Sequence, residues 1–372
     1  MYKSFVSCLF ALCLIPLSRQ ARAQGLKDML GESFLIGVAV SGGEIGGNHP
    51  ETSAVITRHF NSIVAENCMK AGPIHPESDR YRWEEADQVV RFGVEHGMAV
   101  IGHCLVWHSQ APHWFFTDGE GKEVCRDTLI QRMRDHIHAV VGRYRSLVRG
   151  WDVINEAFND DGTLRQTPYL RIIGPEYFEL AFRFAHEADP DAELYYNDYS
   201  MALPAKRDAV CRLVRDLQAK GCRIDAVGMQ SHLGLNYPDL GEYEKTIQAL
   251  IDCGVKVQIT ELDVSVLPNP WDFHGADVNQ QFDYEQRLNP YTAGLPDSVY
   301  QQFEQRYLDL FALYRRYRPH ILRVTLWGLD DGGSWLNGFP IRNRTNYPLL
   351  FDRQLNAKPV VGKIMQLFEE VP

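Results

Sequence analysis

The sequence contains no CxxC pair, no GxGxxG motif opening a helix after its first predicted strand, and no surplus of basic residues. A core of this size needs no covalent cross-links, so we expect the six cysteines beyond residue 23 to be buried free thiols with at most one disulfide. The missing glycine motif argues against a doubly wound dinucleotide-binding sheet. The formal net charge of −10 makes nucleic acid an unsuitable partner, because phosphate binding requires a basic face.

Long apolar runs are also lacking, apart from one near the N-terminus. Residues 5–17 form an apolar stretch that follows Lys3, is too short to span a bilayer, and precedes an Ala-x-Ala sequence ending at Ala23. This pattern predicts a signal peptide over residues 1–23, cut after Ala23, and export to the periplasm or the outside of the cell. Residues 24–372 then form one domain, because no low-complexity linker divides them.

Short β-rich runs alternate with segments of helical periodicity along this domain. Eight strands are predicted, at residues 34–40, 61–65, 99–103, 150–154, 193–196, 226–229, 256–260 and 322–326. Helices are predicted at residues 83–96, 126–144, 175–189, 204–220, 240–253 and 298–317. This alternation predicts a single (β/α)8 TIM barrel of the α/β class. Residues 265–296 show little periodicity and are predicted to be a loop inserted after the seventh strand.

Polar and aromatic side chains follow seven of the eight predicted strands. They are Glu66, Asn67 and Lys70; His103, Trp107, His108 and Gln110; Asn155 and Glu156; Asn197, Asp198 and Tyr199; Gln230 and His232; Glu261 and Asp263; Trp327 and Trp335. Any one of them has an ordinary structural explanation, but buried polar groups without partners cost about 1 to 3 kcal/mol each. In such barrels the carboxyl ends of the strands form the active site, so a ring of these groups predicts a polar ligand.

The types of residue in this ring suit a sugar. Amides and carboxylates match hydroxyl groups, and tryptophan faces match the apolar faces of a pyranose ring. Glycoside hydrolysis needs two carboxyl groups, and Glu156 and Glu261 follow the fourth and seventh strands. His232 is expected to hydrogen-bond Glu261 and keep it ionised, with Asp263 holding the imidazole. We therefore interpret Glu261 as a nucleophile and Glu156 as an acid and base of raised pKa.

Seven ordered segments resemble the signatures of glycoside hydrolase family 10, the retaining endo-1,4-β-xylanases. They are FNSIVAENCMK, GHCLVWHSQAPHW, WDVINEA, YNDY, GMQSHL, ITELDV and TLWGLDDGGSW. The resemblance implies an acid/base at Glu156 and a nucleophile at Glu261, and retention would place their carboxyl groups about 5 to 5.5 Å apart. It further implies Glu66, Asn67 and Lys70 on the non-reducing side; His103, Trp107, Gln110, Asn155 and Gln230 around the cleaved sugar; Trp327 and Trp335 as walls; Asn197 and Tyr199 on the leaving side; and His232 and Asp263 as supports of the nucleophile.

Several alternatives remain at this stage. A β-glucan hydrolase would share the barrel and the two carboxylates, and a non-catalytic sugar-binding protein would share the ring of polar groups. A metal-dependent hydrolase is suggested by His136 and His138, but histidines two apart on a helix do not face one another. We expect a monomer that acts on xylan and xylo-oligosaccharides without metal or cofactor. The 265–296 insertion could cover the cleft, clamp a decorated chain or pack outside the barrel.

Overall fold

The computed structural model describes residues 24–369, apart from residue 48 and residues 271–274. The predicted signal peptide over residues 1–23 lies outside this part of the chain. Within the described residues, eight parallel strands close into a barrel in the order β1, β2, β3, β4, β5, β6, β8, β9, with β9 paired to β1. These strands are β1 Leu35–Val40, β2 Ser62–Ala65, β3 Ala99–Trp107, β4 Val148–Asn155, β5 Glu193–Asp198, β6 Ala226–Met229, β8 Lys256–Ser265 and β9 Ile321–Leu326. The predicted (β/α)8 fold is confirmed.

Several strands run further than predicted at the end that carries the site, and β8 does so most, reaching Ser265 instead of residue 260. Strand β3 was predicted to stop at His103, but it continues to Trp107, because a register shift against β4 after His103 lets the ladder resume. After β6 ends at Met229, the chain breaks at Ser231, whose φ is 65°, and forms a short additional strand, β7 His232–Gly234, beside β8. Trp107 and His232 therefore lie on strands, which hold their side chains more firmly than loops would.

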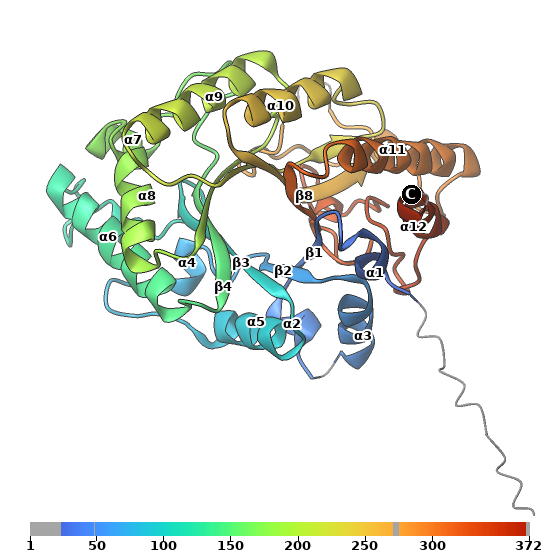
Figure 1. Cartoon of the computed structure of the whole chain (residues 1–372), viewed down its shortest axis with the longest axis horizontal. Coiled ribbons are helices and arrows are strands. Elements are labelled where there is room, and N and C mark those ends of the chain that lie inside the picture. The colour runs from blue at the N-terminus through green and yellow to red at the C-terminus, as the bar shows by residue number, and fades with distance from the viewer. Residues whose placement is uncertain (1–23, 48, 271–274, 370–372) are drawn as a thin grey trace, which may run out of the picture.

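Helices surround the barrel on its outside (Figure 1). The six predicted helices are present as α5 Glu84–Glu95, α6 Arg126–Arg143, α8 Tyr177–Ala188, α9 Pro204–Ala219, α10 Leu240–Asp252 and α11 Asp297–Arg316. Each buries one apolar stripe against the strands, as in α5, where Ala86, Val89, Val90 and Phe92 point inward at helical spacing.

Six further helices were not predicted, because most are too short to show a periodic apolar stripe. They are α1 Leu26–Leu30, α2 Gly42–Ile45, α3 Pro50–His59, α4 Ala71–Ile74, α7 Pro168–Ile173 and α12 Pro359–Glu369. Helix α2 shows how such a short helix begins. Ser41 and Glu44 cap each other's backbone N–H groups there, and this capping box starts the single turn of α2.

The core has two parts, one between strands and helices and one inside the barrel. The barrel interior is filled by Ala39, Val64, Ile101, Tyr195, Ala226 and Trp327. At Gly102 on β3, a Cβ atom would lie only 2.0 Å from the Trp151 ring, so glycine is required for this close approach. The filled interior makes the barrel a packed platform and places the functional groups at its carboxyl end.

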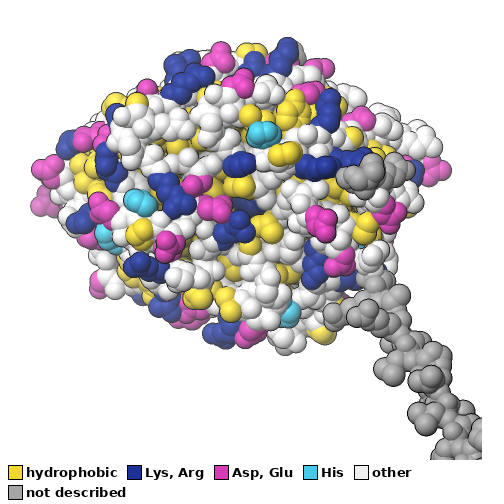
Figure 2. All heavy atoms as spheres, viewed as in Figure 1, with side chains coloured by type: hydrophobic (Ala, Val, Ile, Leu, Met, Phe, Trp, Pro, Cys, Tyr) yellow, Lys and Arg dark blue, Asp and Glu magenta, His cyan; other side chains and the backbone are white. Residues whose placement is uncertain are grey.

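The six cysteines of the described chain are all free. Five are buried, as predicted, while Cys125 is exposed at the start of α6. No helix in the described part of the chain is long and apolar enough to cross a membrane. Figure 2 shows basic and acidic side chains interspersed over the visible face, without a concentration of positive charge there.

Candidate active site

The two glutamates occupy the carboxyl end of the barrel on β4 and β8. Glu156 directly follows β4 with a φ of 57°, and its N–H donates to the carbonyl of Asn197 at the end of β5. Glu261 lies within β8, and its N–H donates to the carbonyl of Gln230. Both residues are 4% exposed. The left-handed turn at Glu156 is a strained conformation for a residue with a side chain, and such turns are concentrated at functional sites.

The carboxylate of Glu156 accepts three hydrogen bonds. Trp107 Nε1 donates to Oε2 at 2.9 Å, while Gln230 Nε2 and Asn155 Nδ2 donate to Oε1 at 3.0 and 3.1 Å. Burial raises the pKa of Glu156 to about 7, and the negative charges of Asp198 and Glu261 act in the same direction, against the hydrogen bonds from Gln230 and Trp107. At neutral pH this carboxyl group therefore exchanges its proton readily, as a general acid and base must.

Glu261 has the opposite electrostatic setting. Burial by itself raises its pKa, but hydrogen bonding and positive charge from His232, together with the charge of His103 and donation from Asn197, hold the pKa below its usual value. His232 Nε2 lies 3.2 Å from Glu261 Oε2, and His232 Nδ1 lies 3.0 Å from Asp263 Oδ2.

The predicted support of Glu261 by His232 and Asp263 is thus present as a chain of contacts. Burial opposes the charged form of His232, yet Asp263 and Glu261 outweigh it and raise the pKa of His232 to about 10. With a proton on each ring nitrogen, the imidazole donates to both carboxylates. Trp335 Nε1 also donates to Asp263 Oδ2 at 2.8 Å, which holds that carboxylate in place.

Three buried amides connect the two glutamates. Asn155 Oδ1 accepts from Asn197 Nδ2 at 3.0 Å and from Gln230 Nε2 at 3.2 Å. Asn197 Nδ2 also donates to Glu261 Oε1 at 2.7 Å, while Gln230 donates to Glu156. The ends of β4, β5, β6 and β8 are therefore joined by one polar network, which fixes the spacing and orientation of both carboxylates.

A cation and two tryptophans form the side of the site next to β2 and β9. Lys70 is 7% exposed, and its Nζ atom donates to Asn67 Oδ1 at 2.9 Å. The same Nζ lies 5.0 Å from the ring centre of Trp107 and 5.9 Å from that of Trp327. Burial raises the pKa of Glu66 in the same region, partly offset by the charge of Lys70.

His103 lies on the floor of the site. It is 2% exposed, its Nδ1 lies 2.9 Å from Asp152 Oδ2, and its ring meets Trp327 edge-on. Trp327 follows β9, and Trp335 belongs to a single 3-10 turn, Trp335–Asn337, beyond it. Both tryptophans contact the imidazole of His232. The structure therefore brings the predicted walls together with the predicted nucleophile support.

Two predicted sugar-contacting residues are placed differently from the rest. Gln110 is exposed on the loop after β3. Tyr199 follows β5 but is only 4% exposed. Its hydroxyl accepts from Arg165, and Lys206 Nζ lies 3.8 Å from its ring centre. Tyr199 is therefore covered in this structure, although the family resemblance implies that it meets the leaving-side sugar.

Sequence reasoning missed several polar partners of the site. Asp152 points into the barrel and contacts His103, but alternation along β4 could not have revealed it, because a register shift against β5 between Asp152 and Ile154 breaks the alternation. Thr260 Oγ1 donates to Asn197 Oδ1 at 2.6 Å, and alternation with Gln258 along β8 could have placed its side chain on the barrel side. Arg165 lies in a loop, so no local pattern in the sequence signalled its approach to Tyr199.

The suggestion of a metal site on α6 receives no support from the geometry. His136 Nδ1 faces His75 Nδ1 at 3.1 Å inside the protein, whereas His138 Nε2 lies 3.3 Å from Glu187. No group of three or more His, Cys, Asp or Glu side chains suited to a metal ion occurs in the described residues.

Comparison with known proteins agrees with this geometry. The family model described as glycosyl hydrolase family 10 matches residues 25–367. Endo-1,4-beta-xylanase A of Xylanibacter ruminicola is 57% identical over 96% of this chain and 97% of its own length. An endo-1,4-beta-xylanase of Geobacillus stearothermophilus is 39% identical over 92% of this chain and 98% of its own length.

Solved structures agree as well. A GH10 endoxylanase retrieved from a sugarcane soil metagenome superimposes with a TM-score of 0.90 at 43% identity, covering 92% of this chain and 100% of that one. Xylanase XynB of Paenibacillus barcinonensis superimposes with a TM-score of 0.83 at 36% identity, covering 93% and 99% of the two chains. The barrel, the paired glutamates and the match along almost the whole described chain lead to one conclusion: the chain belongs to glycosyl hydrolase family 10 and is a glycoside hydrolase.

Proposed function

We propose that this enzyme hydrolyses internal β-1,4 bonds of xylan with retention of anomeric configuration. The observation that carries the proposal is the opposite tuning of two buried glutamates at one end of the barrel. The pKa of Glu156 is raised to about 7, while that of Glu261 is lowered by His232 and its neighbours. A protonated carboxyl group beside an ionised one is what a two-step displacement at an anomeric carbon requires.

In the first step, a Glu261 oxygen attacks the anomeric carbon while the proton of Glu156 moves to the glycosidic oxygen. The carbon–oxygen bond to the leaving sugar breaks, and a covalent glycosyl-enzyme ester remains. In the second step, the ionised Glu156 removes a proton from water, the water oxygen attacks the anomeric carbon, and Glu261 leaves as a carboxylate. The proton that Glu156 gives to the leaving sugar is replaced by one from water, so both carboxyl groups regain their starting protonation states after one cycle.

Several features support a xylan substrate. The relatives from Xylanibacter ruminicola and Geobacillus stearothermophilus carry the name endo-1,4-beta-xylanase, and one solved neighbour, a mutant 34% identical to this chain, is in complex with xylotriose. Lys70, Asn67 and Glu66 offer charged and amide groups to hydroxyls on the non-reducing side. Trp327 and Trp335 provide aromatic walls for the ring of the cleaved sugar, next to Trp107.

The remaining site residues have parts in the same proposal. His103, Gln110, Asn155 and Gln230 surround the cleaved sugar, and Asn197 and Tyr199 meet the leaving-side sugar. Residues 1–23 direct export, which would bring the enzyme to its polymeric substrate outside the inner membrane. We further propose that the enzyme acts as a monomer.

The test combines substrate choice with separate removal of the two carboxyl groups. Wild-type enzyme should release reducing sugar from xylan much faster than from a β-glucan, and NMR of the first product should show the β-anomer. Glu261→Ala should lose both xylan and aryl β-xylobioside hydrolysis. Glu156→Ala should lose xylan hydrolysis but retain the glycosylation step with an aryl leaving group that needs no protonation, and azide should accelerate its turnover by replacing base-assisted water.

Three results would contradict the proposal. An α-anomer as first product would indicate inversion, and faster release from β-glucan would favour the rival substrate. Binding of xylo-oligosaccharides without cleavage of any substrate would show a sugar-binding protein. The double variant Glu156→Gln/Glu261→Gln, which keeps the shape of both side chains, serves as the inactive control for all assays.

A further inference from the structure

The loop between β8 and α11 crosses the mouth of the barrel. In the strand order β1, β2, β3, β4, β5, β6, β8, β9, strand β8 lies opposite β3. Asn279 of this loop nevertheless donates through Nδ2 to Ser109 Oγ, beyond the end of β3, at 3.4 Å. A contact between loops of opposite strands requires the chain to pass over the opening between them. We name residues 275–282 of this loop the strap.

An ion pair holds the strap on the leaving side of the site. Asp277 Oδ2 lies 3.2 Å from Arg165 Nη1, and the two side chains are 21% and 16% exposed. The guanidinium of Arg165 also donates to the hydroxyl of Tyr199. The strap is therefore joined by charge and hydrogen bonding to the loops that follow β3, β4 and β5.

The strap covers Tyr199. Gly275 has a φ of 68°, and a Cβ atom there would lie 2.6 Å from Tyr199 Cε2 and 3.0 Å from Ser200 Oγ. Lys206 occupies one face of the same tyrosine ring, and the side chain of Tyr199 is left with almost no exposed surface. A sugar on the leaving side cannot stack on Tyr199 while Gly275 stays in this position.

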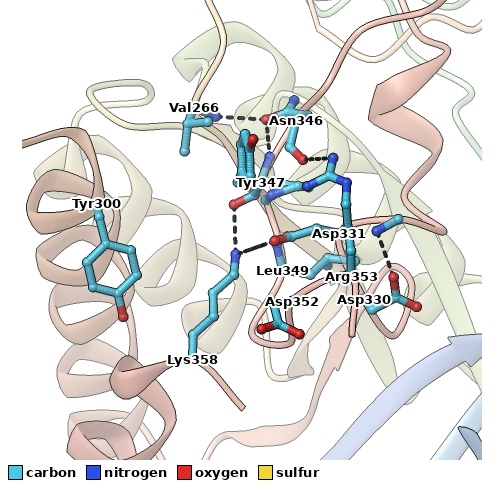
Figure 3. Close-up of polar contacts among 12 residues, drawn as sticks. Val266, Tyr300, Asp330, Asp331, Asn346, Tyr347, Leu349, Asp352, Arg353 and Lys358 are labelled. Carbon is cyan, nitrogen blue, oxygen red and sulfur yellow. Dashed lines mark hydrogen bonds and ion pairs between the residues drawn. The ribbon is translucent and has the colours of Figure 1, made fainter. Parts of the chain in front are cut away.

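The chain is firmly anchored where it leaves β8, at Ser265 and Val266. Figure 3 shows the N–H of Val266 donating to Asn346, whose backbone carbonyl in turn accepts from Arg353. Asn346 Nδ2 also donates to Ser265 Oγ at 2.9 Å. At the other end of the strap, the N–H of Phe282 donates to the carbonyl of Pro340 at 3.1 Å.

A buried ion pair secures the segment that carries this anchor. Lys358 Nζ lies 2.8 Å from Asp331 Oδ2 and donates to the carbonyl of Tyr347 (Figure 3). The strap is thus held at Phe282, and the contacts of Asp277 and Asn279 hold its middle across the mouth.

A cavity of 610 Å³ adjoins the strap and the nucleophile support. Gly275 and Ala276 form part of its wall, together with Tyr199, His232 and Asp263. This volume lies within the range of about 300 to 1,000 Å³ that small ligands occupy. Beside the strap there is therefore a partly open cavity with room for a short group, and the strap itself is a barrier to an extended chain at Tyr199.

We propose that the strap determines which bonds of a xylan chain are cut, with Asp277 as its specificity-determining residue. With the strap closed, short leaving groups fit, and bonds near the reducing end are cleaved. With the strap released from Arg165, Tyr199 becomes accessible, and longer leaving groups fit. This inference rests on the proposed xylanase function and concerns only the leaving side, so the glutamates and the non-reducing side act alike in both arrangements.

The test uses the full enzyme and the variant Asp277→Asn, which removes the charge but keeps the shape. Xylohexaose is hydrolysed in ¹⁸O water, and mass spectrometry of the labelled and unlabelled products identifies each cleaved bond. We expect the ratio of central to reducing-end cleavage to rise about three- to tenfold in Asp277→Asn, the factor that an ion pair of about 1 kcal/mol corresponds to. An aryl β-xylobioside has no leaving-side sugar, so its kcat/KM should stay unchanged.

Asp283→Asn is the matched control. Asp283 is an exposed carboxylate just beyond the strap, with no ion pair among the described residues. It should leave the cleavage ratio unchanged. A second measurement needs no variant at all: raising NaCl from about 0.02 M to about 0.5 M screens the Asp277–Arg165 pair, so the central cleavage of wild type should rise with salt. That dependence should be smaller in Asp277→Asn.

An unchanged cleavage ratio in Asp277→Asn would overturn the proposal, as would a shift towards shorter leaving groups, which would mean that the strap binds the sugar. A rise of the same size in Asp283→Asn would also overturn it, since it would reflect the charge of the whole loop. Failure of the proposed function has a different signature, because wild type would then hydrolyse neither xylohexaose nor the aryl xylobioside.

Discussion

The hydrogen bond from Gln230 to Glu156 offers a direct test of how the site sets its proton donor. Gln230 Nε2 lies 3.0 Å from Glu156 Oε1 and favours the ionised form of that carboxyl group. The variant Gln230→Met keeps the length of the side chain and removes the donor. The pKa of Glu156 should therefore rise, and the alkaline limb of the pH–rate profile should move to higher pH.

The size of the change follows from two known quantities. A hydrogen bond to a charged group stabilises that group by about 1.5 to 3 kcal/mol, and about 1.36 kcal/mol corresponds to a change of one unit in its pKa. Trp107 still donates to Glu156 Oε2 at 2.9 Å and Asn155 to Oε1 at 3.1 Å, so we take the lower end of this range. The pKa of Glu156, about 7 in the intact protein, should then rise to about 8.

The assay is kcat/KM for an aryl β-xylobioside with a poor leaving group, measured from about pH 4 to about pH 10, because kcat/KM reports groups of the free enzyme. Gln230 is also proposed to contact the sugar, so the height of the profile should fall. The prediction concerns only the pH at which the alkaline limb falls, and not the height of the profile. The acid limb is an internal control, since Gln230 donates to Glu156 and Asn155 and has no hydrogen bond to the side chain of Glu261 in the described structure.

A second, independent variant should raise the pKa of Glu156 in the same direction. Trp107→Phe removes the donor to Glu156 Oε2 and should also move the alkaline limb upward. If the alkaline limb stayed in place in both variants, Glu156 would not be the group that limits activity at high pH. A downward move would mean that these donors favour the neutral carboxyl group, and the assigned acid would be wrong.

Three further predictions concern stability. Gly102→Ala should lower the free energy of unfolding by about 2 kcal/mol or more in urea titrations, because its Cβ would overlap the Trp151 ring, whereas Gly142→Ala in helix α6, with nothing within 4 Å, should be neutral or slightly stabilising. Lys206→Met should lower the free energy of unfolding by about 3 kcal/mol, because it leaves the buried carboxylate of Asp198 without its cation. An unchanged Tm would refute this. His232 has its pKa raised from 6.5 to about 10, so its stabilising effect is complete below about pH 6.5 and is lost as pH rises through about 10. Between about pH 6.5 and about pH 10, the unfolding free energy of His232→Asn should fall by about 1 kcal/mol or more less than that of wild type. A wild-type unfolding free energy that rises over this pH range would contradict the assignment.

The fold could be predicted because it is encoded in local periodicity. Eight short apolar runs separated by amphipathic segments leave few arrangements other than a closed parallel barrel. Single-turn helices such as α2 Gly42–Ile45 escaped prediction, since a capping box between two residues carries little periodic signal. The extension of β3 to Trp107 also escaped, because the register shift that permits it depends on the neighbouring strand.

Most of the site could be predicted for a related reason. The carboxyl ends of parallel strands meet at one end of the barrel, so residues that end different strands come together whatever the loops do. Glu156, Glu261, His232 and Asp263 were placed correctly by this rule alone. The resemblance of the seven segments to family 10 then extended the prediction to the substrate.

The sequence by itself determined the barrel, the two glutamates and the chemistry that they suit, because these depend on strand ends and residue types. Only the tertiary structure decided the electrostatics, since both glutamates are buried but the hydrogen bond and charge of His232, with the charge of His103, lower the pKa of Glu261 alone. It also decided the state of the leaving side, where Asp277 meets Arg165 across 112 positions of the chain. Loop contacts over that separation have no periodic signal, because they are set by the packing of the whole barrel beneath them.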